Sequence, residues 1–266
     1  MTDLDYLAHL SRESARLRET LSGAPDDARV PSCPDWDAVD LLWHLAGVQW
    51  FWGELVERGV TVGAVADGLE ATRPDDRAGV ESAYDDASRR LGEVLAGNPP
   101  ETAVWTWADD HTVGFIRRRQ AHEALIHRVD AELTSGDRTP LDQALADDGV
   151  DEVLRVMYGG EPSWGDFTPH EGQTVRVEAT DTGSTWVLTL GRFSGSEPDS
   201  DRSYSDEPDM RIADTDDGGP TAATVRGTAQ DLDLWLWHRE PLGPIERTGD
   251  EAVLAELART VEPGIN

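Results

Sequence analysis

The segment from residue 38 to residue 58 restricts the fold of this chain more strongly than any other. It contains no proline, and its first half is apolar around the whole circumference of a helix, through the residues Val39, Leu41, Leu42, Trp43, Leu45, Ala46 and Val48. A helix that is apolar on every side is stable in water only when other helices cover it. The segment therefore predicts a helix at the centre of a helical bundle, with Asp37 as its N-cap.

Three more segments place apolar residues at helical spacing and are followed by glycine or proline. They are residues 3–22, residues 76–96 and residues 113–133, the last with Thr112 as its expected N-cap. Four helices of this length predict an antiparallel four-helix bundle over residues 1–140. Such bundles build their ligand sites from side chains on facing helices.

The pattern of the sequence changes after residue 140, where apolar and polar residues begin to alternate as they do in strands. Strands are predicted at 174–180, 184–190, 210–213 and 222–226, and helices at 141–158, 228–237 and 250–260. Residues 59–74 predict a loop, and residues 194–209, rich in Ser, Asp and Pro, predict a mobile acidic loop. The chain is therefore expected to be an α+β protein of two domains, a four-helix bundle in residues 1–140 and a small α/β domain in residues 141–266.

Acidic residues dominate the charge of the chain. Fifty-three Asp and Glu residues stand against 23 basic residues, all of them arginine, and give a formal net charge of -30 at pH 7. Such a surface repels nucleic acid and anionic lipid, so we expect neither as a partner. The acidity favours an adaptation of solubility, for example to a salty cytoplasm, over a specific cationic partner.

The sequence also predicts a cytoplasmic protein, monomeric or homodimeric, without a membrane partner. The N-terminal residues lack the basic and apolar regions of a signal peptide, and no apolar run approaches the roughly 20 residues of a membrane span. The single cysteine, Cys33, excludes an intramolecular disulfide and fits a reducing compartment. Cys33 has no evident base beside it, so we do not expect it to be a nucleophile.

Glu123 and His127 carry the main chemical signal of the sequence. They are four residues apart in the predicted helix, so a carboxylate and an imidazole lie one turn apart on one face. His44, in the middle of the apolar second helix, is the candidate for a third metal ligand. Two imidazoles and a carboxylate favour zinc, with iron or nickel as alternatives, and three protein ligands leave a position open for catalysis. The alternatives are a hydrogen-bonded core histidine at position 44 and an exposed polar pair at positions 123 and 127.

Three residues near these ligands have supporting roles in this hypothesis. Asp130 follows His127 by three residues and Asp40 precedes His44 by one turn, so either carboxylate could orient a histidine ligand. In the alternative, each forms an ion pair with an arginine. His122 points about 100° away from Glu123 on a helix, and we expect it to pack or to support the ligands.

Three pairs of motifs, in chain order, resemble those of one protein family. The first pair is VPSCPDW at 30–36 and LLWHLAGV at 41–48, the second is RRQAHE at 118–123 and HRVDAE at 127–132, and the third is GTAQDL at 227–232 and LWLWHR at 234–239. Together they resemble the mycothiol-dependent maleylpyruvate isomerase family, and they span nearly the whole chain.

The resemblance implies a DinB-like metal-binding bundle followed by a C-terminal domain similar to sterol-carrier proteins. It implies a zinc ion held by His44, Glu123 and His127, the three residues that helical spacing also indicates, and mycothiol as the thiol cosubstrate. Coordination of the thiol sulfur to zinc lowers the thiol pKa and yields a thiolate nucleophile. The cofactor-binding residues are not identified by the sequence.

Three functions follow from this chemistry. Reversible addition of the thiolate to a conjugated cis double bond makes the protein an isomerase, and formation of a stable thioether makes it a mycothiol S-transferase. The third alternative is a non-catalytic metal-binding or interaction protein. Arg239 is the candidate catalytic residue, because a guanidinium can hold a substrate carboxylate or stabilise enolate charge. Its alternative role is to complete the C-terminus of a helix.

Overall fold

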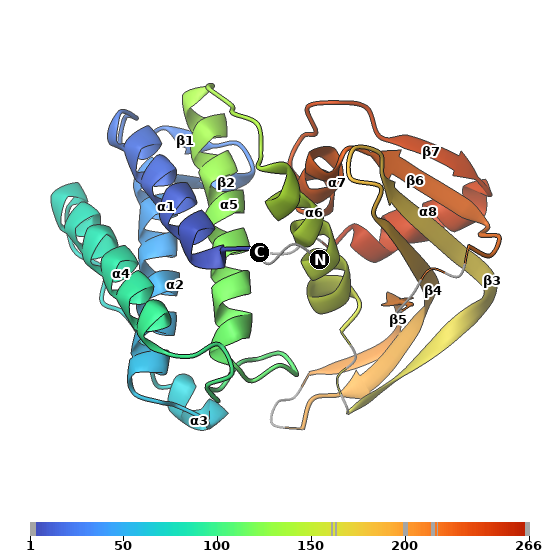
Figure 1. The fold of residues 1–266 in the computed structure, drawn as a ribbon, viewed down its shortest axis with the longest axis horizontal. Helices are drawn as coiled ribbons and strands as arrows, with labels where there is room; N and C mark the ends of the chain where they lie inside the picture. Colours follow the sequence, from blue (N-terminus) through green and yellow to red (C-terminus); the bar gives the residue numbers. More distant parts are fainter. Residues whose placement is uncertain are drawn as a thin grey trace. The chain divides into compact units, whose positions relative to one another are not determined.

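A computed structural model describes residues 4–160, 162, 164–198, 202–213, 216 and 218–263 of the chain. The protein divides into two compact units, Met1–Pro140 and Leu141–Asn266 (Figure 1). Among the described residues, no helix has the length and apolar character needed to cross a membrane. The α+β class, with a helical N-terminal part and a C-terminal α/β part, is confirmed.

The N-terminal unit consists of helices and one small hairpin. Its elements are α1 (Tyr6–Ser22), β1 (Arg29–Val30), β2 (Cys33–Asp37), α2 (Ala38–Glu57), α3 (Gly63–Ala66), α4 (Arg77–Gly97) and α5 (Val113–Ser135). Helix α1 packs mainly against α5, and α2 packs mainly against α4. The predicted caps are confirmed, since the side chains of Asp37 and Thr112 accept hydrogen bonds from the first turns of α2 and α5. Helix α5 ends at Gly136, whose φ of 78° lies in the left-handed region that glycine adopts most readily.

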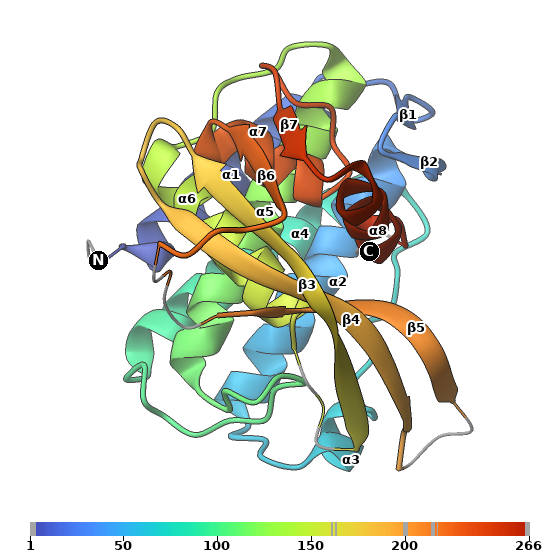
Figure 2. The ribbon, with the colours of Figure 1, turned by 90° about the vertical axis from the view of Figure 1, so that its right-hand side faces the viewer.

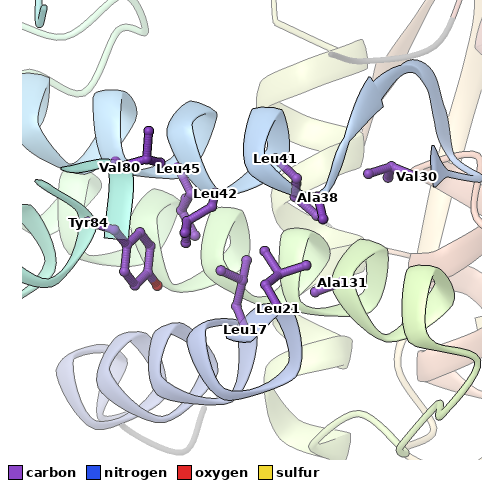
Figure 3. Packing of buried hydrophobic residues seen from close by; sticks show 11 residues of the cluster. Leu17, Leu21, Val30, Ala38, Leu41, Leu42, Leu45, Val80, Tyr84 and Ala131 are labelled. Atoms are coloured by element: carbon purple, nitrogen blue, oxygen red, sulfur yellow. The ribbon is translucent and has the colours of Figure 1, made fainter. Parts of the chain in front are cut away.

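The core of this unit lies between α1, α2, α4 and α5. Figure 3 shows Leu17 and Leu21 of α1 facing Leu41 and Leu42 of α2, and Tyr84 of α4 lies in the same cluster. These side chains are at most 2% exposed. The nearly uniform apolar character of α2 is explained by this position, because α2 contacts the other three long helices.

Charged residues are also buried between α1 and α5. The guanidinium of Arg128 lies 2.9 Å from Glu13 of α1 and 2.9 Å from Glu132 of α5, and the side chains of all three residues are at most 5% exposed. Arg16 of α1 reaches the other oxygen of Glu132 at 3.0 Å. Buried charges are tolerated only when they are paired, so this network holds α1 against α5, the helix that carries Glu123 and His127, in one register.

The C-terminal unit is a five-stranded mixed sheet with helices. Its elements are α6 (Gln143–Glu152), which continues as the π-helix η1 (Val153–Tyr158), β3 (Gly165–Ala179), β4 (Thr185–Ser196), β5 (Ser203–Ile212), β6 (Ala223–Gly227), α7 (Ala229–Leu236), β7 (Glu246–Gly249) and α8 (Glu251–Val261). The strand order is β5-β4-β3-β6-β7, with β3 and β6 parallel and the other neighbours antiparallel (Figure 2). Helix α8 packs against β3, β5, β6 and β7, and Thr228 caps α7 as predicted.

The structure corrects the prediction of a mobile loop over residues 194–209. Strand β4 extends to Ser196, and β5 begins at Ser203 and pairs with it. Trp164, Phe193 and Tyr204 form an aromatic cluster at this end of the sheet, with ring centroids 5.4 to 5.9 Å apart. These contacts stabilise strands whose polar composition resembles a loop. Of the predicted loop, residues 199–201 lie outside the described residues. The loop predicted at residues 59–74 likewise contains the short helix α3.

Candidate metal centre

Helices α2 and α5 bring His44, Glu123 and His127 together. The Nε2 atom of His44 lies 3.4 Å from Oε1 of Glu123, and the Nε2 atom of His127 lies 3.2 Å from the same oxygen. The two imidazole rings meet edge to face, with centroids 4.7 Å apart. The side chain of His44 is 29% exposed, so solvent reaches this group of residues although it lies within the bundle. Each residue thus offers one ligand atom, and these atoms lie within 4.8 Å of one another.

Two of the three separations between these atoms fit a tetrahedral metal site, and the third is at most 4.8 Å. Ligand atoms on two corners of a tetrahedral zinc site with bonds of about 2.0 to 2.1 Å lie about 3.3 Å apart. The two histidine-to-glutamate separations, 3.4 and 3.2 Å, match this value. Two imidazole nitrogens and one carboxylate oxygen suit zinc, iron or nickel. The residues therefore fit a divalent transition metal with a fourth position left for another ligand.

A buried carboxylate orients His127. Its Nδ1 atom lies 2.9 Å from Oδ2 of Asp130, whose side chain is 0% exposed. The other oxygen of Asp130 accepts a hydrogen bond from the Ser32 hydroxyl at 2.5 Å. In the neutral imidazole, a hydrogen at Nδ1 leaves Nε2, the atom that faces Glu123, with its lone pair. The arrangement is that of a histidine ligand held by a carboxylate.

The charges of the site reinforce each other. Burial acts to raise the pKa of Glu123, but hydrogen bonds from His127 and His44 outweigh it and hold this pKa well below its usual range. Burial acts to lower the pKa of His127, but hydrogen bonds to Asp130 and Glu123 raise it to about 9. Without a metal, His127 therefore holds a proton at neutral pH, in the place where a divalent cation would supply positive charge.

The hairpin of β1 and β2 contributes two residues that the sequence analysis missed. Ser32 lies in its turn and bonds Asp130, and Trp36 in β2 places its ring 4.7 Å from that of His44 and 6.3 Å from that of His127, between centroids. Both residues belong to the first motif, VPSCPDW, which was their only signal in the sequence. The hairpin therefore forms one wall of the site.

A third missed residue is Arg119 of α5. Its side chain is 4% exposed, and Nη2 lies 3.2 Å from Oε2 of Glu123. The signal for it was the spacing of four residues between Arg119 and Glu123, the same spacing that separates Glu123 from His127.

The remaining predicted residues lie outside the group of three candidate ligands, and His122 packs as expected. Asp40 follows its alternative role, because one oxygen accepts from the Asp37 backbone in the capping box of α2 and the other lies 2.7 Å from Arg73. His122 is buried, with its ring edge-on to that of Tyr6. Arg239 belongs to the C-terminal unit, where its Nη1 donates to the Trp237 carbonyl at the end of α7. This contact fits the helix-terminus role, and a catalytic role for Arg239 stays a prediction.

Comparison with known protein families shows to which family this chain belongs. Residues 7–132 match the mycothiol maleylpyruvate isomerase N-terminal domain, and residues 144–256 match the C-terminal domain of the same proteins. The chain belongs to the mycothiol-dependent maleylpyruvate isomerase family. The two matches cover both compact units, so the relationship inferred from the three pairs of motifs is confirmed.

Two solved structures share the fold of this family member. They are the crystal structure of the mycothiol-dependent maleylpyruvate isomerase and that of a histidine-to-alanine mutant of it, with TM-scores of 0.59 and 0.60. Each aligns with 94% of this chain and 97% of its own chain at 12% sequence identity. No curated protein matches this chain by sequence. At this identity the similarity shows the fold alone.

Proposed function

We propose that this protein is a zinc- and mycothiol-dependent enzyme that activates a low-molecular-weight thiol for attack on an electrophilic substrate. The proposed reaction is cis–trans isomerisation by reversible thiol addition, and membership of a mycothiol-dependent isomerase family supports it. The observation that carries the proposal is the convergence of two Nε2 atoms on one oxygen of Glu123 at a point that solvent reaches. Because the chain belongs to a mycothiol-dependent family, the thiol of mycothiol is the proposed ligand for the fourth coordination position.

A zinc ion bound by His44, Glu123 and His127 would supply a coordination site at which a thiol loses its proton near neutral pH. The protein's own residues prepare this site. Asp130 holds the hydrogen of His127 on Nδ1, which leaves Nε2 as the ligand atom. Glu123 is ionised throughout the neutral range because its pKa is well lowered. Trp36 covers His44 on one side and so limits the access of water there.

The first experiment measures metal content. The wild-type protein should bind one zinc ion per chain, and His44→Ala and Glu123→Ala should each lose most of it. His122→Ala is the matched control, because this histidine lies on α5 beside Glu123 but outside the group of three. Stoichiometric zinc in both ligand variants would refute the assignment of the ligands.

The second experiment tests the thiol. Mycothiol added to the cobalt-substituted protein should produce a sulfur-to-metal charge-transfer band, and no band should appear in Glu123→Ala. Metal binding without any band would favour the non-catalytic alternative.

Product analysis then separates the isomerase from the S-transferase. An isomerase returns a product of unchanged mass with altered double-bond geometry, whereas an S-transferase yields a stable thioether whose mass includes mycothiol.

A further inference from the structure

The two oxygens of Glu123 face different groups. Oε1 lies 3.4 Å from His44 Nε2 and 3.2 Å from His127 Nε2, whereas Oε2 lies 3.2 Å from Arg119 Nη2. Arg119, Glu123 and His127 follow each other at intervals of four residues, so they form one row along α5. The carboxylate is therefore shared between the imidazoles on one side and a guanidinium on the other.

Arg119 is too deeply buried to act as an ordinary surface ion pair. Its side chain is 4% exposed and that of Glu123 is 18% exposed. A hydrogen bond between a guanidinium and a carboxylate is among the stronger ones, and exclusion of water strengthens it further. Burial of an arginine is unfavourable unless a carboxylate pairs with it, so the fold specifies this contact.

The number of oxygens that Glu123 offers decides how many positions remain at a bound metal. A carboxylate can bind a metal through one oxygen or through both. If Glu123 binds through one oxygen, then Glu123, His44 and His127 together fill three positions of a tetrahedral metal and leave one for an exogenous ligand. If Glu123 bound through both oxygens, its second oxygen would crowd that position and make a water-bound metal five-coordinate.

We infer that Arg119 is a positioning residue that keeps Glu123 a monodentate metal ligand, bound through Oε1 alone. It thereby preserves the fourth coordination position of the metal for the thiol. This inference rests on the proposed function, because it requires that a metal bind to the three residues. Arg119 engages Oε2 with hydrogen bonding and positive charge, so only Oε1 is directed at the metal position. Arg119 itself touches neither substrate nor metal in this role.

The test compares cobalt-substituted proteins without any thiol. Arg119→Gln removes the charge, and Arg119→Lys keeps the charge but lacks the planar fork that orients a carboxylate. Arg117→Gln is the matched control, because Arg117 lies on the same helix and donates instead to the carbonyls of Leu95 and Asn98. Circular dichroism establishes that each variant is folded.

We expect all variants to bind one cobalt ion. The visible absorption of Arg119→Gln should fall at least twofold, because five-coordinate cobalt absorbs more weakly than tetrahedral cobalt, and Arg119→Lys should fall less. Arg117→Gln should match the wild type. An unchanged spectrum in both Arg119 variants overturns the inference. So does loss of cobalt from Arg119→Gln, because Arg119 would then be required for the site to form at all. If Arg119→Gln does not fold, the spectrum of Arg119→Lys decides alone.

A mycothiol titration of the same proteins separates this inference from the proposed function. Arg119→Gln should require at least tenfold more mycothiol than the wild type to reach half of the charge-transfer band. If the wild type shows no band but the Arg119 variants still lose absorption without thiol, the proposed function fails and the role of Arg119 stands. A wild type that binds no cobalt overturns both.

Discussion

Metal binding to this protein should release about one proton at pH 7, and the proton should come from His127. Hydrogen bonds to Asp130 and Glu123 raise the pKa of His127 to about 9, so the metal-free site is protonated at neutral pH. A metal must displace this proton to reach Nε2. Glu123 adds no proton, because its pKa is held well below the usual range.

The size of the effect follows from the distance between the pKa and the working pH. At pH 7 the solution is about two pH units below the pKa of His127. Competition from the proton therefore weakens metal binding about 100-fold, or about 2.7 kcal/mol. The apparent zinc affinity should therefore rise about tenfold between pH 7 and pH 8 and level off above pH 9.

Two measurements check this prediction. Chelator competition gives the zinc affinity at each pH, and calorimetry in buffers of different ionisation enthalpy counts the protons released. Asp130→Asn is the matched variant, because it removes one of the two carboxylates that raise the pKa of His127. This variant should release fewer protons at pH 7. A zinc affinity that does not change between pH 7 and pH 8 in the wild type would refute the reasoning.

Four further predictions follow. First, the metal-free protein should lose up to about 3 kcal/mol of stability as pH rises from about 6.5 to about 9. The raised pKa of His127 stabilises the fold at pH values below the pKa of the unfolded state, and this contribution is lost above the pKa of the folded state. Urea unfolding at a series of pH values measures this loss, and a stability that does not change with pH would contradict the prediction. Second, Asp130→Asn should weaken zinc binding about 10- to 100-fold in chelator competition at about pH 10, which lies above the pKa of His127, so that little proton competition remains. Ser32→Ala should have a smaller effect, because the Ser32 hydroxyl bonds Asp130, which in turn bonds His127. Third, salt should raise the melting temperature, because it screens the repulsion among the acidic residues that give the net charge of -30. The screening length falls from about 30 Å at 0.01 M salt to about 3 Å at 1 M salt. Melting curves that coincide at different KCl concentrations would exclude this effect. Fourth, if Arg239 holds a substrate carboxylate, Arg239→Lys should raise KM and leave the cobalt spectrum unchanged, whereas a purely structural role should lower the melting temperature without changing KM.

The long helices could be predicted because their signals are local. Asp37 and Thr112 mark the beginnings of α2 and α5, and glycine or proline follows their ends, so the predicted and observed bounds differ by one or two residues. The pairing of Glu123 with His127 needs only the helical repeat. The proximity of His44 to this pair could be predicted only by assuming that an apolar helix lies inside the bundle.

The residues that the sequence analysis missed depend on contacts between distant segments. Ser32 and Trp36 reach the site through a hairpin whose two prolines obscure any strand pattern. Arg119 is one of three consecutive arginines, and composition does not show that Arg117 turns to backbone carbonyls while Arg119 turns to Glu123. The burial of Arg128 could not be predicted either, because its buried partner Glu13 lies on another helix.

The distribution of the polar groups over the helices has a consequence for metal exchange. Arg119, Glu123, His127 and Asp130 all belong to α5, so their mutual spacing persists for as long as that one helix is intact. His44 alone comes from α2. A small displacement of α2 would therefore reduce the proposed metal site to two ligands in a single step, while the groups on α5 stay arranged to bind an ion again. Uptake and loss of metal should accordingly follow the opening of the interface between these two helices, rather than the unfolding of either one.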